Sequence, residues 1–216
     1  TFAPATPGGA SNGNGSRRRR DAWGPFSRLA GVIGLRSVIF FGLQAFVPVY
    51  FAHRLGASEA AGNAALSVML VAGAAGTLVG GRLVDRIGRR RVLVGSMALQ
   101  LPLLLLFMAA DGGVLAGAVL AAIGFVTIMS FSVTVVMGQE YLPHRLGIAS
   151  GVTLGFAIGV GGVAAALLGA LADHAGLHTV MWTITLLPIA GTALALTLPE
   201  SAVRARPAIA TALHLR

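Results

Sequence analysis

The chain of 216 residues has no cysteine, no lysine and only seven acidic residues. The absence of cysteine excludes disulfides, thiolate metal sites and cysteine nucleophiles, but it leaves the cellular compartment open. Charged residues make up 11% of the chain and hydrophobic residues 56%, which is far from the composition of soluble domains. The composition therefore indicates an integral membrane protein.

Long apolar runs account for most of the sequence, and none has an aspartate, glutamate, lysine or histidine near its middle. Each run has about 20 residues, the length that crosses a bilayer as a helix. A soluble helical domain would show a polar stripe at helical spacing, which is almost absent here. We predict an all-α, polytopic membrane protein with six transmembrane helices, at residues 29–51, 60–83, 92–109, 114–137, 147–172 and 180–198.

The sixteen basic residues are all arginine, and their placement predicts the orientation. Fourteen lie on connections that alternation assigns to one side, Arg54 lies on the other, and Arg36 lies inside a span. The positive-inside rule then places both termini in the cytoplasm and the chain in the inner (plasma) membrane. The basic run at 17–20 suits an orientation signal beside anionic lipid, so we expect no nucleic-acid partner despite the net charge of +9.

Polar, Gly/Ser/Pro-rich sequence precedes the first apolar run. We therefore predict a flexible, basic cytoplasmic linker at 1–27, a six-helix bundle at 28–200 and a cytoplasmic tail at 201–216. The first residue is Thr1, and no small-residue cleavage pattern typical of a secretory signal follows the basic run. We expect the chain to be part of a longer protein, divided within a central loop.

The pattern G-x-L-x-D-x-x-G occurs twice, at residues 81–88 and 169–176. The first copy ends the second predicted helix and the second copy ends the fifth, so the predicted topology places them on opposite sides of the membrane. Three helices followed by three of opposite orientation form the inverted repeat found in halves of transporters. We therefore predict two inverted three-helix repeats.

The segment 80–90 resembles the signature loop of the major facilitator superfamily, whose transporters have twelve helices in two six-helix halves joined by a cytoplasmic loop. Six helices after a polar linker are similar to the C-terminal half, which makes these helices equivalent to helices seven to twelve. Further motifs resemble the fosmidomycin-resistance branch of drug exporters; they lie at residues 35–37, 41–43, 48, 139–143 and 147–151.

This resemblance implies a secondary active transporter that works by alternating access with proton exchange. It implies export of a small anionic drug such as a phosphonate. The expected partners are the lipid bilayer, a small-molecule substrate and an N-terminal six-helix half.

The signature loop suits a conformational role. Gly80 and Gly81 allow the second helix to approach a neighbour closely, and Gly88 permits a tight reversal. Asp85 can pair with Arg86 or Arg89, or accept from the N–H groups at a helix start. The resemblance implies that the loop closes the cytoplasmic gate in the outward-facing state; the alternative is that its arginines only anchor the loop. The predicted gate residues are Gly81, Asp85, Arg86, Gly88 and Arg89.

Arg36 is the leading candidate for substrate contact. It lies about 10 Å into the first helix, at 1.5 Å per residue, and a charge at that depth is costly unless it faces a wet cavity or a partner. Its fork of donors suits phosphonate, phosphate or carboxylate groups. The alternative is a side chain that extends back to the cytoplasmic headgroups.

Other polar residues near mid-span are candidates for the same cavity. Thr127, Ser130 and Thr134 share one face of the fourth helix, although such hydroxyls commonly bond to their own helix carbonyls. Gln44 is predicted to face the cavity or another helix. The predicted cavity residues are Arg36, Gln44, Thr127, Ser130 and Thr134.

Two further assignments concern coupling and packing. Glu140, at the cytoplasmic end of the fourth helix, is the candidate proton or gate residue in this chain; any other proton carrier is expected in the missing half. Glycines at intervals of four on the fifth helix predict close helix packing. These are Gly151, Gly155 and Gly159.

The sequence shows no metal cluster, no nucleophile with a base and no phosphate loop, so we predict neither an enzyme nor a bound cofactor. The alternatives left open are an importer of organic anions or sugars, a non-transporting membrane scaffold, and a channel-like oligomer of six-helix units.

Overall fold

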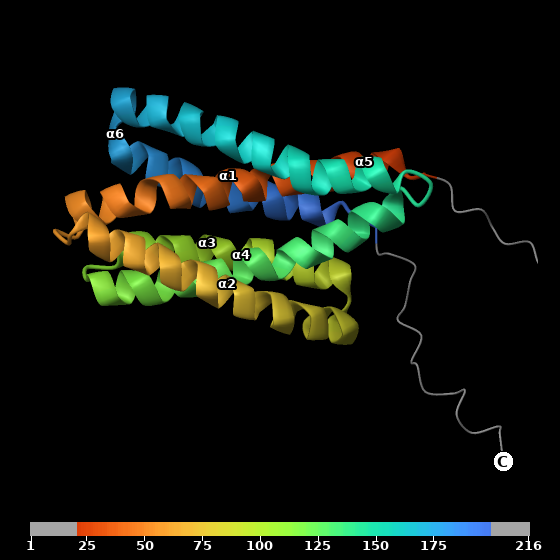
Figure 1. The fold of residues 1–216 in the computed structure, drawn as a ribbon, viewed down its shortest axis with the longest axis horizontal. Helices are drawn as coiled ribbons and strands as arrows, with labels where there is room; N and C mark the ends of the chain where they lie inside the picture. The colour runs from red at the N-terminus through yellow and green to blue at the C-terminus, as the bar shows by residue number, and fades with distance from the viewer. Residues whose placement is uncertain (1–20, 200–216) are drawn as a thin grey trace, which may run out of the picture.

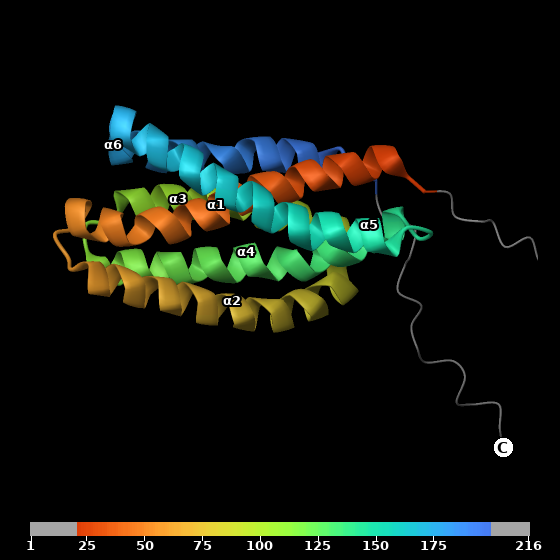
Figure 2. The same ribbon diagram turned by 45° about the horizontal axis from the view of Figure 1, so that its top comes forward.

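A computed structural model of the chain describes residues 21–199, and this part is built from helices (Figures 1 and 2). Five helical stretches are long and apolar enough to cross a membrane. The first four agree in order and position with the predicted spans. They are α1 (Trp23–Arg54), α2 (Glu59–Ile87), α3 (Arg89–Ala109) and α4 (Gly113–Tyr141).

The fifth stretch, Leu146–Leu196, contains both remaining predicted spans. It consists of α5 (Leu146–Ser150), the π-helix η1 (Gly151–Phe156) and α6 (Ala157–Leu196). Its 51 residues would extend about 75 Å as a straight helix, more than twice the hydrocarbon thickness. The backbone leaves helical geometry at Gly176, where the chain reverses direction (Figure 1). The prediction of six helices thus differs from the five observed because the helix resumes directly after this reversal.

Gly88 and Gly176 make the same backbone turn. Their φ and ψ angles are 89° and 154° for Gly88, and 81° and 160° for Gly176. This region is open essentially to glycine alone. The two residues hold the same position in the two copies of the repeated motif, and their turns lie at opposite ends of the bundle (Figure 1). The inverted repeat predicted from sequence is therefore visible in the backbone.

Glycines allow α2 and α4 to pack with their backbones in close contact. A Cβ atom at Gly76 would lie 2.4 Å from the carbonyl oxygen of Phe125, and one at Gly124 would lie 2.2 Å from that of Met69. Gly73 and Gly80 continue the contact along α2. Small residues of this kind are the usual means of close helix packing in membranes. The close approach predicted for Gly80 is made against Met129 of α4.

The helices extend past the apolar runs at the end of the bundle where both described termini lie (Figure 1). α1 begins at Trp23, inside the segment predicted to be linker. Arg145, in the loop after α4, contacts this start: its guanidinium lies 5.7 Å from the ring centre of Trp23 and 3.5 Å from a carboxylate oxygen of Asp21. The rest of the predicted linker, 1–20, and the predicted tail, 201–216, lie outside the described residues.

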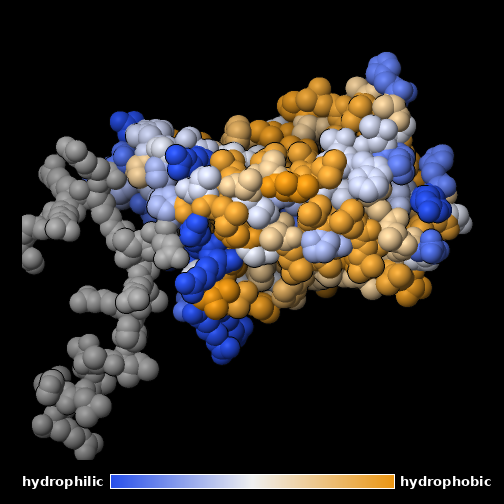
Figure 3. Space-filling model, turned by 180° about the vertical axis from the view of Figure 1, so that it is seen from behind, coloured by the Kyte–Doolittle hydropathy of each residue, from blue (hydrophilic) through white to orange (hydrophobic). Residues whose placement is uncertain are grey.

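The face of the bundle seen in Figure 3 carries apolar side chains along its middle and polar side chains toward its ends. Val71, Leu78 and Val163 each expose more than 60% of their surface. Apolar surface on this scale is unfavourable in water and suits contact with lipid or another apolar surface.

Candidate functional site

Arg36 lies beside a cavity of about 270 Å³ formed by α1, α4 and the η1–α6 junction. Only 4% of its surface is exposed. Leu154 and Ile158, which also line the cavity, are strongly exposed, so the cavity opens on that side. Its lining residues are Arg36, Ser37, Phe40, Phe41, Thr127, Ile128, Phe131, Leu154, Ala157 and Ile158.

The guanidinium of Arg36 is held by an aromatic ring. Its Cζ atom lies over Phe131 of α4, 5.0 Å from the ring centre. The Nη1 atom is buried and has no hydrogen-bond partner among residues 21–199. In this conformation the charge is therefore inside the bundle, and the guanidinium makes no hydrogen bond with the described residues.

Thr127 also lines this cavity, and its hydroxyl already has two protein partners. It donates to the carbonyl oxygen of Ile123 at 2.7 Å and accepts from Nε2 of Gln100 at 2.7 Å. The structure thus brings two predicted cavity residues, Arg36 and Thr127, to the same space.

The other predicted cavity residues do not line it. Ser130 and Thr134 are buried and donate to the carbonyl oxygens three residues before them, at 2.9 and 2.8 Å. Gln44 is half-buried and makes no hydrogen bond within the described part.

Two polar residues of this region were missed from sequence. Gln100 of α3 is fully buried, and its Oε1 has no partner in the part of the chain that the structure describes. A single amide within an otherwise apolar run was the available signal. Ser37 is buried and lines the cavity, and no described group hydrogen-bonds to its hydroxyl. Its only signal was its position next to Arg36.

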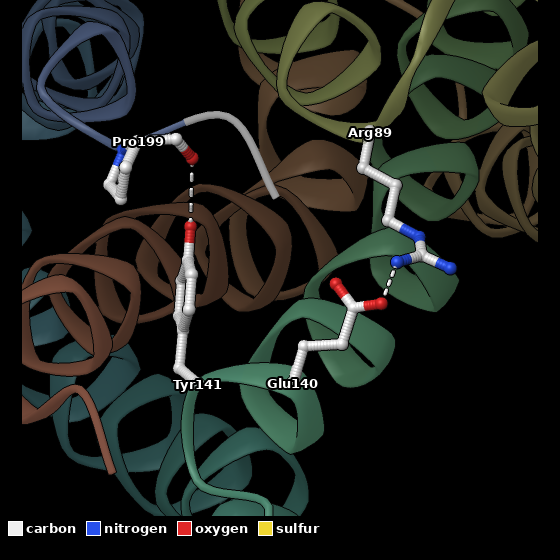
Figure 4. A network of polar contacts seen from close by, with 4 residues as sticks. All are labelled: Arg89, Glu140, Tyr141 and Pro199. Carbon is white, nitrogen blue, oxygen red and sulfur yellow. Dashed lines mark hydrogen bonds and ion pairs between the residues drawn. The ribbon is translucent and has the colours of Figure 1, made fainter. Parts of the chain in front are cut away.

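Arg89 and Glu140, which the sequence assigned to separate roles, form an ion pair (Figure 4). Arg89 is the first residue of α3 and Glu140 is the last but one of α4. Their side chains are 25% and 17% exposed, and Oε2 of Glu140 is buried with no described partner. The pair joins α3 to α4 at the arginine-rich end of the bundle.

Nearby contacts hold the end of α6 at the same place. Arg90 donates to the carbonyl oxygen of Leu196 at 2.6 Å, and Arg28 donates to that of Thr197 at 3.1 Å. Both arginines therefore cap carbonyls that lack partners at a helix C-terminus. The Tyr141 hydroxyl donates to the carbonyl oxygen of Pro199 at 3.2 Å (Figure 4).

The remaining residues of the predicted gate are exposed. Asp85 and Arg86 form no ion pair among the described residues, so the possible pairing of Asp85 with Arg89 is replaced by the Arg89–Glu140 pair. A Cβ at Gly81 would meet no described atom within 4 Å. Gly88 makes the turn between α2 and α3 described above.

The glycine stripe on the fifth predicted helix faces away from the other described helices. A Cβ at Gly151, Gly155 or Gly159 would meet no described atom within 4 Å, and all three are exposed. The close packing predicted for this stripe therefore has no partner within the described part of the chain.

The cavity, the inverted repeat and the arginine-rich turn can be compared with known families. The sequence model of the Major Facilitator Superfamily matches residues 26–213. The chain belongs to the major facilitator superfamily. Members of this superfamily are transporters embedded in the lipid bilayer that move small molecules, and they are not enzymes.

Two relatives are similar in sequence to part of this chain. The uncharacterized MFS-type transporter YfnC of Bacillus subtilis (strain 168) is 49% identical over 124 residues, which are 57% of this chain and 30% of the relative. The fosmidomycin resistance protein of Escherichia coli (strain K12) is 36% identical over 149 residues, 69% of this chain and 36% of the relative. The chain thus aligns with about a third of the length of each relative.

Proposed function

We propose that this chain is the C-terminal half of an alternating-access exporter of small organic anions, and that the cavity beside Arg36 is its contribution to the substrate site. The observation that carries the proposal is the buried guanidinium with a free donor. A charged group kept inside a membrane protein is costly, and such residues usually serve a ligand or ion pathway. Nothing else in the cavity lining is charged.

The direction and the class of substrate are supported by similarity. The Escherichia coli relative is named a fosmidomycin resistance protein, which favours export of a phosphonate or a related anionic drug. An importer of organic anions or sugars would use the same fold, and the direction of flux separates the two.

The Arg89–Glu140 pair suits the gate of such a transporter. It joins α3 to α4 at the arginine-rich end, and its two charged groups can separate if these helices move apart. We propose that Gly81, Asp85, Arg86 and Gly88 complete this gate by contacting the other half. Proton exchange would use Glu140 or a group in that half, because the apolar runs of this chain have no carboxylate near their middle.

This chain has an exposed surface on which the proposed N-terminal half can pack. Gly151, Gly155 and Gly159 form an exposed stripe of small residues, and only 28% of the apolar window of α2 is buried, against 50% for α1 and α4. We propose that the N-terminal half covers this stripe and α2. By the positive-inside rule, the arginine-rich end faces the cytoplasm of a cell whose inner membrane holds the protein. We propose no nucleic-acid partner.

Flux into membrane vesicles tests the proposal. The chain is expressed alone, and together with the six-helix half that we propose precedes it. Export of a labelled phosphonate or carboxylate that appears only on co-expression supports the proposal. Flux from neither preparation favours a scaffold, and flux from this chain alone favours a channel-like oligomer; either result overturns it.

A further inference from the structure

The cavity beside Arg36 offers few polar groups, and this limits the ligand that it can take. Three of its ten lining residues are polar. The hydroxyl of Thr127 already donates to Ile123 and accepts from Gln100, so it has no free donor. The groups left for a ligand are the guanidinium of Arg36, which makes no hydrogen bond with the described residues, and the Ser37 hydroxyl. Since guanidinium only donates and a hydroxyl can donate, the site favours an acceptor with negative charge.

The charge of the cavity lining suits a ligand with a single negative charge. Arg36 is the one cation among the lining residues, and no carboxylate lies among them. A dianion would keep one charge uncompensated in a medium of low polarity, which is strongly unfavourable. A neutral ligand would leave the guanidinium without compensation.

The rest of the lining suits an apolar body. Seven of the ten lining residues are apolar, and three of these are phenylalanines. The volume of about 270 Å³ is slightly below the usual range of about 300–1,000 Å³ for small-molecule sites, so the ligand must be small. Burial of an aromatic or branched group here would gain favourable transfer out of water. A small ion such as acetate has little apolar surface to bury against this lining and gains little binding free energy from it.

We propose that the cavity binds an organic monoanion with an aromatic or branched apolar body, and that Phe131 is the positioning residue that holds Arg36 ready for its charge. The proposal rests on the proposed function for its place in transport. The anion is bound by Arg36 and Ser37, and the apolar body lies against Phe40, Phe41 and Ile158.

Phe131 explains how Arg36 stays available. A carboxylate at this position would fix the guanidinium but also neutralise it. The face of an aromatic ring attracts the cation without occupying its N–H groups, which lie in the guanidinium plane. The free Nη1 agrees with this arrangement. Because Phe131 is on α4 and Arg36 is on α1, the contact also links two of the helices that line the cavity.

Binding to the full chain in nanodiscs tests the proposal without a gradient or transport. The probes are 2-naphthoate, acetate, methylphosphonate and the neutral 2-naphthamide, measured by calorimetry. We expect saturable binding of 2-naphthoate at least about 10-fold tighter than that of each of the other three. Equal affinity for acetate or methylphosphonate would overturn the assigned ligand class. Saturable binding of 2-naphthamide at similar affinity would overturn the role of the charge.

Variants at position 131 test the positioning role. Phe131→Leu should weaken 2-naphthoate binding about 3- to 30-fold, the range spanned by cation–π contacts at exposed and at desolvated sites. Phe131→Tyr should retain binding, and Phe131→Glu should abolish it as Arg36→Gln does. The matched control is Phe125→Leu, on the same helix but outside the cavity lining. Equal effects of the two leucine variants, or retained binding in Phe131→Glu, would overturn the role of Phe131.

Two further readings keep these results interpretable. Helical circular dichroism and the unfolding midpoint show whether each variant folds. If Phe131→Leu does not fold, Phe131→Met takes its place with the same expected loss of binding. Binding as expected without flux in the co-expression experiment would overturn the proposed function and leave this inference standing. Anion flux that changes neither with substitution of Phe131 nor with the size of the substrate's apolar body would overturn this inference and leave the proposed function standing.

Discussion

Arg89 and Glu140 form an ion pair that joins the first turn of α3 to the last turn of α4. The two residues are 51 positions apart in the sequence, and each is only partly exposed. Partly buried pairs are screened less by salt than surface pairs. This contact is therefore a candidate for holding one end of the bundle closed, as the proposed gate requires.

A double-mutant cycle measures how much this ion pair contributes to the free energy of unfolding. Arg89→Gln and Glu140→Gln should each lower the free energy of unfolding by about 1–2 kcal/mol, and the double variant should cost little more than either one, because the same contact is lost. Reversible unfolding in mixed micelles gives these values. Arg91→Gln is the control, since Arg91 is exposed and forms no described ion pair. Additive losses, or an equal loss in the control, would contradict a coupled pair.

The α2–α4 contact should not tolerate a methyl group. Gly76→Ala places a Cβ 2.4 Å from the Phe125 carbonyl oxygen, so the backbones must separate. We expect a loss of about 1–3 kcal/mol in unfolding free energy, the usual cost of overpacking. Gly95→Ala on α3, where a Cβ meets no described atom within 4 Å, should be neutral or slightly stabilising. A cost at Gly95 as large as at Gly76 would show that helix contact is not the cause.

The two turns of the inverted repeat should respond alike. Gly88→Ala and Gly176→Ala force an L residue to the positive φ angles of 89° and 81°, with ψ near extended values. Each should lower the unfolding free energy by about 1–3 kcal/mol. Asparagine should not restore either turn, because it tolerates the left-handed helical region but not this one. A stability unchanged by both alanine variants would contradict the strained turn.

Hydropathy and motif spacing could predict much of this fold. Apolar runs separated by arginine-rich turns located the membrane helices, and the repeated G-x-L-x-D-x-x-G motif placed residues 88 and 176 at equivalent positions of an inverted repeat. That both glycines have positive φ angles is seen only in the structure. The helix ends were less predictable. α1 starts at Trp23 because Asp21, Trp23 and Arg145 hold it there, and this contact depends on a loop more than 100 residues away.

The candidate site could be predicted only in part. A charge within a span singled out Arg36, but its partner Phe131 depends on how α1 and α4 face each other. The same is true of the Arg89–Glu140 pair and of the Gln100–Thr127 hydrogen bond, which join different helices. A glycine stripe such as that of residues 151, 155 and 159 shows where a helix can pack closely, but the sequence does not say which helix approaches it.

The orientation of the bundle can be tested with single cysteines, because the chain has none of its own. Arg91→Cys and Glu59→Cys place thiols at exposed positions at opposite ends of the bundle. With the arginine-rich end in the cytoplasm, a membrane-impermeant maleimide added to intact cells should label the cysteine at 59 and not that at 91. Both sites should react after lysis. The reverse pattern in intact cells would place the arginine-rich end outside.

The central claim is that Arg36 contacts the transported anion, and one measurement tests it most directly. Anion flux is measured in vesicles that contain this chain and its proposed N-terminal half, with Arg36 intact or replaced by Gln or Met at equal membrane levels. We predict that both variants lose anion flux by at least about 10-fold, because a charge-assisted hydrogen bond is lost. The unfolding free energy of Arg36→Met should stay the same or rise, since a buried unpaired charge is removed. Flux kinetics that are unchanged in Arg36→Gln and Arg36→Met would contradict the claim.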